Sequence, residues 1–208
     1  MMIKARLFSA VAIGAMVFMA TDVRAADVRF ADLDVAVTTA DGWATADAAT
    51  LKILTQMTAP GIAAHAQRKG VSASPNVIDS ATLLLDSKLP IGTPGDNPNV
   101  ILAKEKAWAD GFEKSGAGYL KLMQDRVQVL GAPTRFVGEP KEMKIGGAVF
   151  HQQDAVNTRV PDAPTKQRFI CTFQNGYYVY FVFSFNDEAD ADFRKMMEVV
   201  NSFRVLKP

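Results

Sequence analysis

One segment near the end of the chain, Tyr177–Phe185, constrains the fold more than any other. It contains no charged residue, and successive side chains of a strand point to opposite faces. One face would carry Tyr177, Val179, Phe181, Phe183 and Phe185, and the other would carry Tyr178, Tyr180, Val182 and Ser184. Because both faces are apolar or aromatic, we expect a central strand that is covered on both sides. Base stacking on these aromatic residues is the less favoured interpretation, because the strand has no Lys or Arg.

The rest of the pattern predicts an α+β fold with a mostly antiparallel sheet between helices. Asn175-Gly176 joins this strand to Gln167–Phe173, and this dipeptide is the strongest short hairpin signal. Other strands are predicted within Val28–Thr39 (one or two), Ala81–Lys88, Val100–Trp108, Arg135–Pro140 and Met143–Asp154. Helices are predicted over Ala46–Met57 after a Thr45 cap, over Ile62–Lys69 beyond a break at Pro60-Gly61, from Ser115 to Gly131, and after an Asn186 or Asp187 cap.

The N-terminal residues 1–25 have the pattern of a secretory signal peptide. Lys4 and Arg6 precede an uncharged run, Leu7–Ala20, which is shorter than the about 20 residues that cross a bilayer. Val23 and Ala25 then provide the small residues of a cleavage site. An uncleaved N-terminal anchor is the alternative, whereas a lipoprotein is excluded because no Cys lies near the site. We therefore expect a periplasmic or secreted single domain, residues 26–208, with no membrane span after cleavage.

Charge and cysteine content exclude several classes of protein. The whole chain has 23 Lys and Arg against 22 Asp and Glu, and loss of residues 1–25 changes the net charge from +1 to −1. This balance argues against nucleic-acid binding, which usually requires a basic excess. The lone Cys171 excludes an internal disulfide and a multi-cysteine metal site. Its alternation with Phe169 and Phe173 predicts a buried, inert thiol rather than a nucleophile.

Few residues are candidates for chemistry, and no cofactor is predicted. His65 and His151 are the only imidazoles, and a metal site would need both together with a carboxylate such as Asp154. Ordinary surface or edge histidines are the favoured interpretation. The acidic run Asp187–Asp192 is typical of a helix N-terminus, where carboxylates are stabilised, and a calcium site is the alternative.

The segment Gly92–Asn99 is the expected contact surface. It contains two Gly and two Pro, so it should be a loop, and loops on a rigid scaffold often carry recognition. Asp96, Asn97, Asn99 and Trp108 are therefore the candidate contact residues. The alternative is that Asp96, Asn97 and Asn99 bond to their own backbone.

Several stretches together resemble the PsbP/DcrB-like family. They are Gly42-Trp43, Gly118-Tyr119-Leu120, Val137-Gly138-Glu139-Pro140 with Gly146-Gly147, and the block from Gly176-Tyr177-Tyr178 to Asn201-Ser202-Phe203. PsbP is an extrinsic subunit of photosystem II, and DcrB is a bacterial periplasmic protein. The resemblance implies an α/β/α sandwich and implies no activity, since members of this fold are mostly accessory or interaction proteins.

The sequence thus predicts a non-catalytic, periplasmic accessory domain that binds another protein. The alternative is a periplasmic protein that binds a small ligand or metal, or an enzyme, with a pocket near the 92–99 loop.

Overall fold

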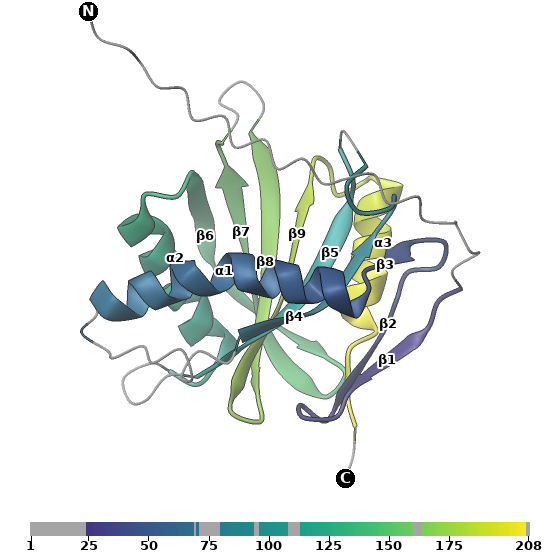
Figure 1. Cartoon of the computed structure of the whole chain (residues 1–208), viewed down its shortest axis with the longest axis horizontal. Coiled ribbons are helices and arrows are strands. Elements are labelled where there is room, and N and C mark those ends of the chain that lie inside the picture. Colours follow the sequence, from purple (N-terminus) through teal and green to yellow (C-terminus); the bar gives the residue numbers. More distant parts are fainter. Residues whose placement is uncertain are drawn as a thin grey trace, which may run out of the picture.

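A seven-stranded antiparallel sheet forms the centre of the protein (Figure 1). The computed structural model describes residues 24–68, 70, 80–93, 96–107, 113–159 and 164–206, so most of the expected signal peptide and Trp108 lie outside the described residues. The strand order is β3-β4-β5-β9-β8-β7-β6. The bounds are β3 Ala44–Thr45, β4 Ser80–Ser87, β5 Asn99–Lys106, β6 Thr134–Ile145, β7 Ala148–Asn157, β8 Thr165–Gln174 and β9 Tyr177–Phe185. The predicted central strand, β9, lies in the middle of this order.

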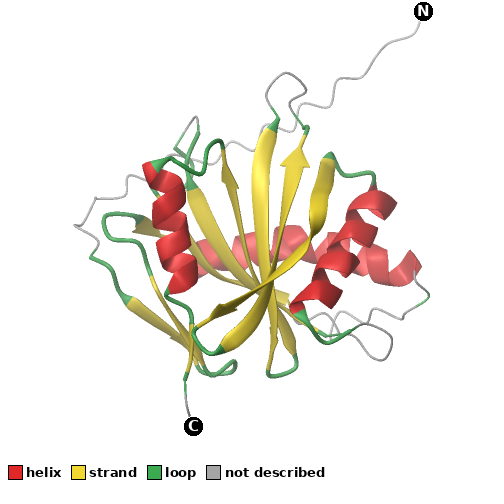
Figure 2. Cartoon of the chain, turned by 180° about the vertical axis from the view of Figure 1, so that it is seen from behind, coloured by secondary structure: helices red, strands yellow, loops and turns green. Residues whose placement is uncertain are grey.

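Helices cover both faces of the sheet. α1 (Ala48–Arg68) crosses in front of the sheet in Figure 1 and behind it in Figure 2, where α3 (Ala191–Asn201) lies in front. α2 (Gly116–Leu130) packs on the face that carries Tyr178, where Tyr119, Leu120 and Leu122 are buried. Val179 and Phe181 of β9 point to the other face and pack with α3. The α+β sandwich and the two-faced burial of β9 are therefore confirmed.

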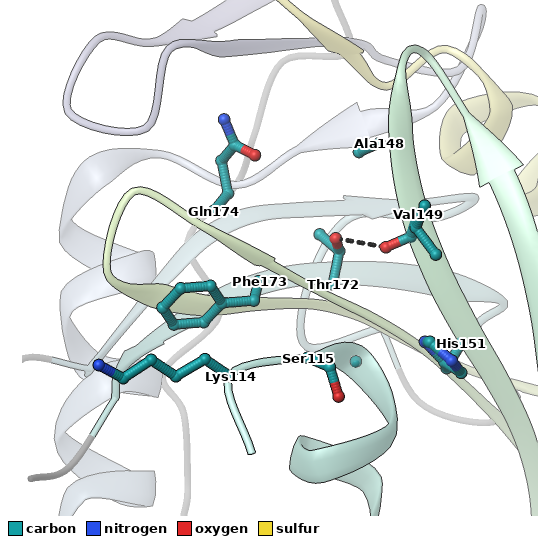
Figure 3. A pocket seen from close by; sticks show the side chains of 9 residues that line it. Lys114, Ser115, Ala148, Val149, His151, Thr172, Phe173 and Gln174 are labelled. Carbon is teal, nitrogen blue, oxygen red and sulfur yellow. Dashed lines mark hydrogen bonds between the residues drawn. The ribbon is translucent and has the colours of Figure 1, made fainter. Parts of the chain in front are cut away.

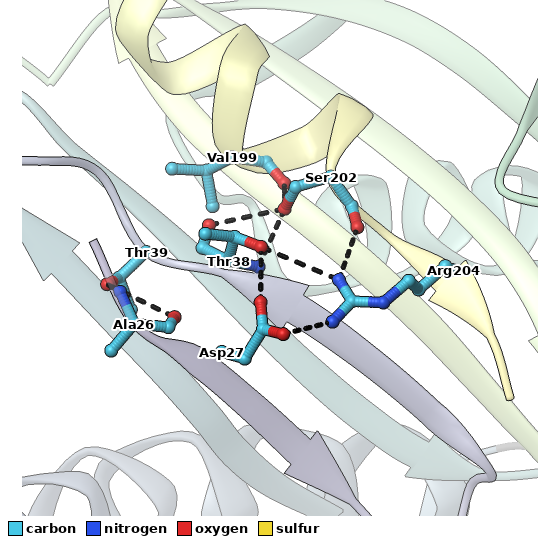
Figure 4. Close-up of polar contacts among 7 residues, drawn as sticks. All are labelled: Ala26, Asp27, Thr38, Thr39, Val199, Ser202 and Arg204. Carbon is cyan, nitrogen blue, oxygen red and sulfur yellow. Dashed lines mark hydrogen bonds and ion pairs between the residues drawn. The ribbon is translucent and has the colours of Figure 1, made fainter.

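A small second sheet joins the two ends of the described chain. It has the order β1-β2-β10, with β1 at Asp27–Phe30, β2 at Val35–Thr38 and β10 at Arg204–Val205. Arg204 Nη2 donates to Asp27 Oδ2 at 2.6 Å, and the Thr38 N–H donates to Ser202 Oγ at 2.8 Å (Figure 4). The hydroxyl of Thr38 donates to Asp27 Oδ1 and lowers the pKa of that carboxyl. These contacts fasten the N-terminal hairpin to the end of α3.

The segments Arg135–Pro140 and Met143–Asp154, predicted as two strands around a short turn, divide differently: the chain turns at Gly146-Gly147, where the sequence allowed a tight bend or bulge. β6 is one strand, because Lys141 and Glu142, where a turn was expected, pair with Gln152 and His151 of β7. Its register with β7 shifts only before them, between Val137 and Lys141, as a bulge in this edge strand. An edge strand tolerates Pro140, which has no N–H to donate to the ladder. The turn itself is Gly146-Gly147, where φ is +53° and +89°.

Three of the predicted helix boundaries are wrong, at the Pro60-Gly61 break and at the starts of α1 and α3, and those of α2 are confirmed. α1 continues through Pro60-Gly61 without a break, because packing on the sheet outweighs the one hydrogen bond that proline removes. α1 begins at Ala48, where Asp47 Oδ1 accepts the Thr50 N–H, and α3 begins only at Ala191. For α2, Ser115 Oγ caps the helix by accepting the Gly118 N–H at 3.0 Å, and Gly131 ends it at φ +61°.

Candidate functional site

The expected contact loop is held in place by its own hydrogen bonds. Asn97 bonds to Leu89 twice, because its Oδ1 accepts the Leu89 N–H and its Nδ2 donates to the Leu89 carbonyl, both at 2.9 Å. Asn99 Nδ2 donates to the Asn97 carbonyl at 2.8 Å, and the Lys88 N–H donates to the Pro98 carbonyl. Asn97 and Asn99 therefore shape the loop, whereas Asp96 is exposed. Trp108, the fourth candidate, lies outside the described residues.

The loop lies beside the N-terminus of α3, which carries the acidic run. Lys88 Nζ pairs with Asp192 at 2.9 Å. Asp187 Oδ1 accepts the Ala189 N–H, and Glu188 pairs with Arg168 at 2.5 Å. Within the described ranges, no group of three or more His, Cys, Asp and Glu is placed to hold a metal ion. We call the described loop residues 88–93 and 96–99, together with residues 186–190, the loop end of the sheet.

Arg168 anchors the acidic run to the sheet. Its Nε donates to Asp154 Oδ1 at 2.7 Å, and its guanidinium lies 5.1 Å from the ring centres of Phe185 and Phe193. The Arg168 side chain is almost completely buried. The ion pair between Glu188 and Arg168 therefore links the loop end to a cation that is fixed inside the protein.

The histidines and the cysteine occupy different surroundings. The side chain of His65 is not among those described. His151 lies on β7, half-buried, and its Nδ1 is buried without a hydrogen-bond partner. Cys171 is fully buried in β8, and this burial raises the pKa of its thiol well above the ordinary value. The prediction of a buried thiol is confirmed.

A buried charged cluster that the sequence did not indicate joins β5 to α2. Arg126 Nη1 donates to Glu105 Oε2 at 2.7 Å, and a second contact pairs Arg126 Nη2 with Glu105 Oε1. The hydroxyl of Tyr119 donates to the same carboxylate at 3.0 Å. Glu105 is 0% exposed and Arg126 5% exposed. Two-point pairing of guanidinium with carboxylate is the geometry that compensates best for the loss of water.

The cluster shifts the pKa of the groups around it. Burial alone would lower the pKa of Arg126, but the hydrogen bonds and charge of Glu105 raise it above the ordinary value. Burial, followed by the charge of Glu105, raises the pKa of Tyr119 strongly and that of Tyr180 to about 12. The Tyr119 ring stacks 4.9 Å from the rings of both Tyr178 and Tyr180. With raised pKa values, Arg126, Tyr119 and Tyr180 keep their protons at neutral pH, which suits a structural role for the cluster.

A cavity of about 220 Å³ lies where β7 and β8 separate (Figure 3). The ladder between these strands ends at the pair His151↔Cys171. Beyond it, β7 continues beside β6 and β8 continues beside β9, so a gap opens between them. Thr172 Oγ1 donates to the Val149 carbonyl at 2.7 Å and bridges the gap. Gln174, which lines the cavity, pairs with Tyr177 at the start of β9. The loop leads into Val100 of β5, which pairs with Phe183 near the end of β9. The cavity and the loop therefore lie at opposite ends of β9.

The first turn of α2 closes one side of the cavity. A side-chain carbon on Gly116 would lie 1.9 Å from the Cys171 carbonyl oxygen, so only glycine allows this close approach. Tyr178 donates its hydroxyl to the Glu113 carbonyl, and Ser115 donates its hydroxyl to Glu113 Oε1. The wall that these residues form is therefore fixed by the core beneath it.

These features define an antiparallel α/β/α sandwich with a braced loop at one end and a small cavity at the other. Among solved structures, the solution structure of the cyanobacterial PsbP (CyanoP) from Synechocystis sp. PCC 6803 is similar to this chain. The two share 12% sequence identity with a TM-score of 0.51, over 93% of this chain and 98% of that chain. The similarity confirms the PsbP-like fold that the resemblance implied. No family model matches the sequence, and no curated protein gives a significant match.

No helix in the described part of the chain is both long and apolar enough to span a membrane.

Proposed function

We propose that residues 26–208 form a periplasmic, non-catalytic accessory domain that binds another protein through the loop end of the sheet. The signal-peptide pattern of residues 1–25 supports the location. The PsbP-like fold supports the accessory role by analogy of fold. The braced loop is the observation on which the choice of surface rests.

The bracing lowers the entropic cost of binding. A loop that Asn97 and Asn99 already hold in one conformation has less freedom to lose when a partner docks. Asp96, Asp187 and Asp190 are exposed at this end and carry carboxylates that do not converge on a metal site. A partner with Lys or Arg side chains at the contact would complement them.

Reversal of the charge at Asp96 should strongly reduce capture of the partner. The tagged, secreted chain would be used as bait in the periplasm and the captured proteins quantified by mass spectrometry. We expect Asp96→Lys to reduce recovery of the specific partner by roughly tenfold or more, because like charges then face each other. The matched control is Glu139→Lys, which reverses an exposed carboxylate on the edge strand β6 and should leave recovery unchanged.

Equal recovery with both variants, or the absence of any specifically captured protein with the unmodified bait, would contradict the proposal.

A further inference from the structure

The cavity between β7 and β8 has the charge of an anion site. Among the described residues that line it, Lys114 is the only Lys or Arg, and none is Asp or Glu. Lys114 has no carboxylate partner among the described residues. The Ser115 and Thr172 hydroxyls already donate to Glu113 and to the Val149 carbonyl. A negatively charged group at the edge of the cavity beside Phe173 would therefore lie on the side where Figure 3 shows the Lys114 ammonium group.

One polar atom in the wall also lacks a partner. His151 Nδ1 is buried and makes no hydrogen bond with the described residues, although most buried polar atoms in proteins are paired. His151 lies at the opposite end of the lining from Lys114, as Figure 3 shows. Because this nitrogen is itself buried from solvent, it offers no contact to a ligand in the cavity as the walls stand, and the anionic group is expected at the Lys114 end.

The remaining wall is apolar. Phe173 lies between the two polar ends in Figure 3, and Ala148 and Val149 line the β7 side. The Phe173 ring contacts Tyr178 edge-on, at 5.5 Å between ring centres, and this contact holds it in place. The ligand should therefore combine one anionic group with an apolar body that packs on an aromatic ring.

The volume limits the size of the ligand. About 220 Å³ is below the range of roughly 300–1,000 Å³ for sites that bind drug-sized molecules. It corresponds to the liquid volume of about seven water molecules. A simple aromatic or short-chain acid fits this space, whereas a nucleotide does not.

We propose that the cavity at the β7–β8 split binds a small organic carboxylate, with its anionic group beside Lys114 and its apolar body against Phe173. This site is separate from the loop end, so it goes beyond the proposed protein-binding function. Gly116 and the Tyr178–Glu113 hydrogen bond fix the wall before the ligand arrives. Preformed walls of this kind favour binding, because little protein ordering is required.

Titration of the ¹⁵N-labelled protein with benzoate tests the site directly. We expect saturable shifts of the Gly116 and Phe173 amide signals. Benzamide has the same shape without the charge, and benzylamine has the opposite charge, so both should bind at least about fivefold more weakly. Lys114→Gln should raise the benzoate Kd about two- to fivefold, the effect of losing an exposed ion pair. Lys121→Gln removes an exposed lysine from the same helix and should not change this Kd.

Several results would overturn the proposal. They are the absence of saturation with benzoate, equal binding of benzamide, shifts that map away from the cavity, and equal effects of Lys114→Gln and Lys121→Gln. Because Lys114 is exposed, its replacement should leave the fold intact, and an unchanged amide spectrum of the free variant would verify this. Loss of partner capture by Asp96→Lys is measured independently, so the two proposals can fail separately.

Discussion

Replacement of either member of the Glu105–Arg126 pair is expected to lower the free energy of unfolding by about 3–5 kcal/mol. Arg126→Met leaves a carboxylate that is 0% exposed with the Tyr119 hydroxyl but without its cation. Glu105→Gln leaves a buried guanidinium without its counter-charge. Domains typically have only about 5–15 kcal/mol of stability, so either change should bring the protein close to unfolding. Urea unfolding followed by tryptophan fluorescence measures the loss, since Trp43 is buried in the core.

An exposed ion pair provides the control. Lys88 and Asp192 are paired at 2.9 Å, but their side chains are 50% and 30% exposed, so Asp192→Asn should cost no more than about 1 kcal/mol. The double variant Glu105→Gln/Arg126→Met should lose much less than the sum of the two single losses, because it leaves no unpaired buried charge. Equal small losses in the buried and exposed pairs would contradict the account of this cluster.

Gly146→Ala is expected to have the second large effect. The added methyl group would lie 1.8 Å from the Phe203 carbonyl oxygen, and the backbone at Gly146 has φ +53°. Backbone atoms must then move apart, including those of the Val205 N–H to Gly146 carbonyl hydrogen bond. Overpacking costs about 1–3 kcal/mol, and the left-handed conformation adds about 1–2 kcal/mol for alanine. Thermal unfolding should show the loss as a Tm several degrees lower.

The neighbouring Gly147 separates these two costs. It also has a positive φ, +89°, but an added methyl group would have no atom within 4 Å. Gly147→Ala should therefore show the conformational cost alone and unfold at a higher temperature than Gly146→Ala. Equal Tm values for the two variants would mean that the hairpin turn does not press against the C-terminal segment.

The sequence predicted the structure best where the signals were local to one strand and its turn. The alternation in Tyr177–Phe185 and the Asn175-Gly176 turn predicted a central strand and its hairpin, since both signals are local. Breaker residues were less reliable signals: β6 continues past Pro140 to Ile145 although the prediction ended a strand there, and α1 continues past the predicted break at Pro60-Gly61. In both places a breaker residue is tolerated by its tertiary setting, an edge-strand bulge in one case and packing of a helix on the sheet in the other.

The sites were less predictable, because they depend on pairing between distant segments. Glu105 lies between Lys104 and Lys106 in the sequence, and this charged run does not indicate burial. Only the packing of α2 on the sheet brings Arg126 and Tyr119 to Glu105.

The cavity likewise follows from the separation of two strands, β7 and β8, which the residue types do not encode locally. The Gly and Pro content of residues 92–99 predicted a loop. Its Asn97 and Asn99 side chains hydrogen-bond to nearby backbone, as the alternative interpretation of these residues predicted.

Site-specific photo-crosslinking tests the central proposal, that the loop end is the contact surface. A benzophenone amino acid would be placed at position 96, and in a second variant at position 139, in the chain as it is secreted by living cells. We predict a crosslink to one protein of defined mass from position 96 and none from position 139. Crosslinks from position 139 alone, or identical products from both positions, would contradict the assignment of the contact surface to the loop end.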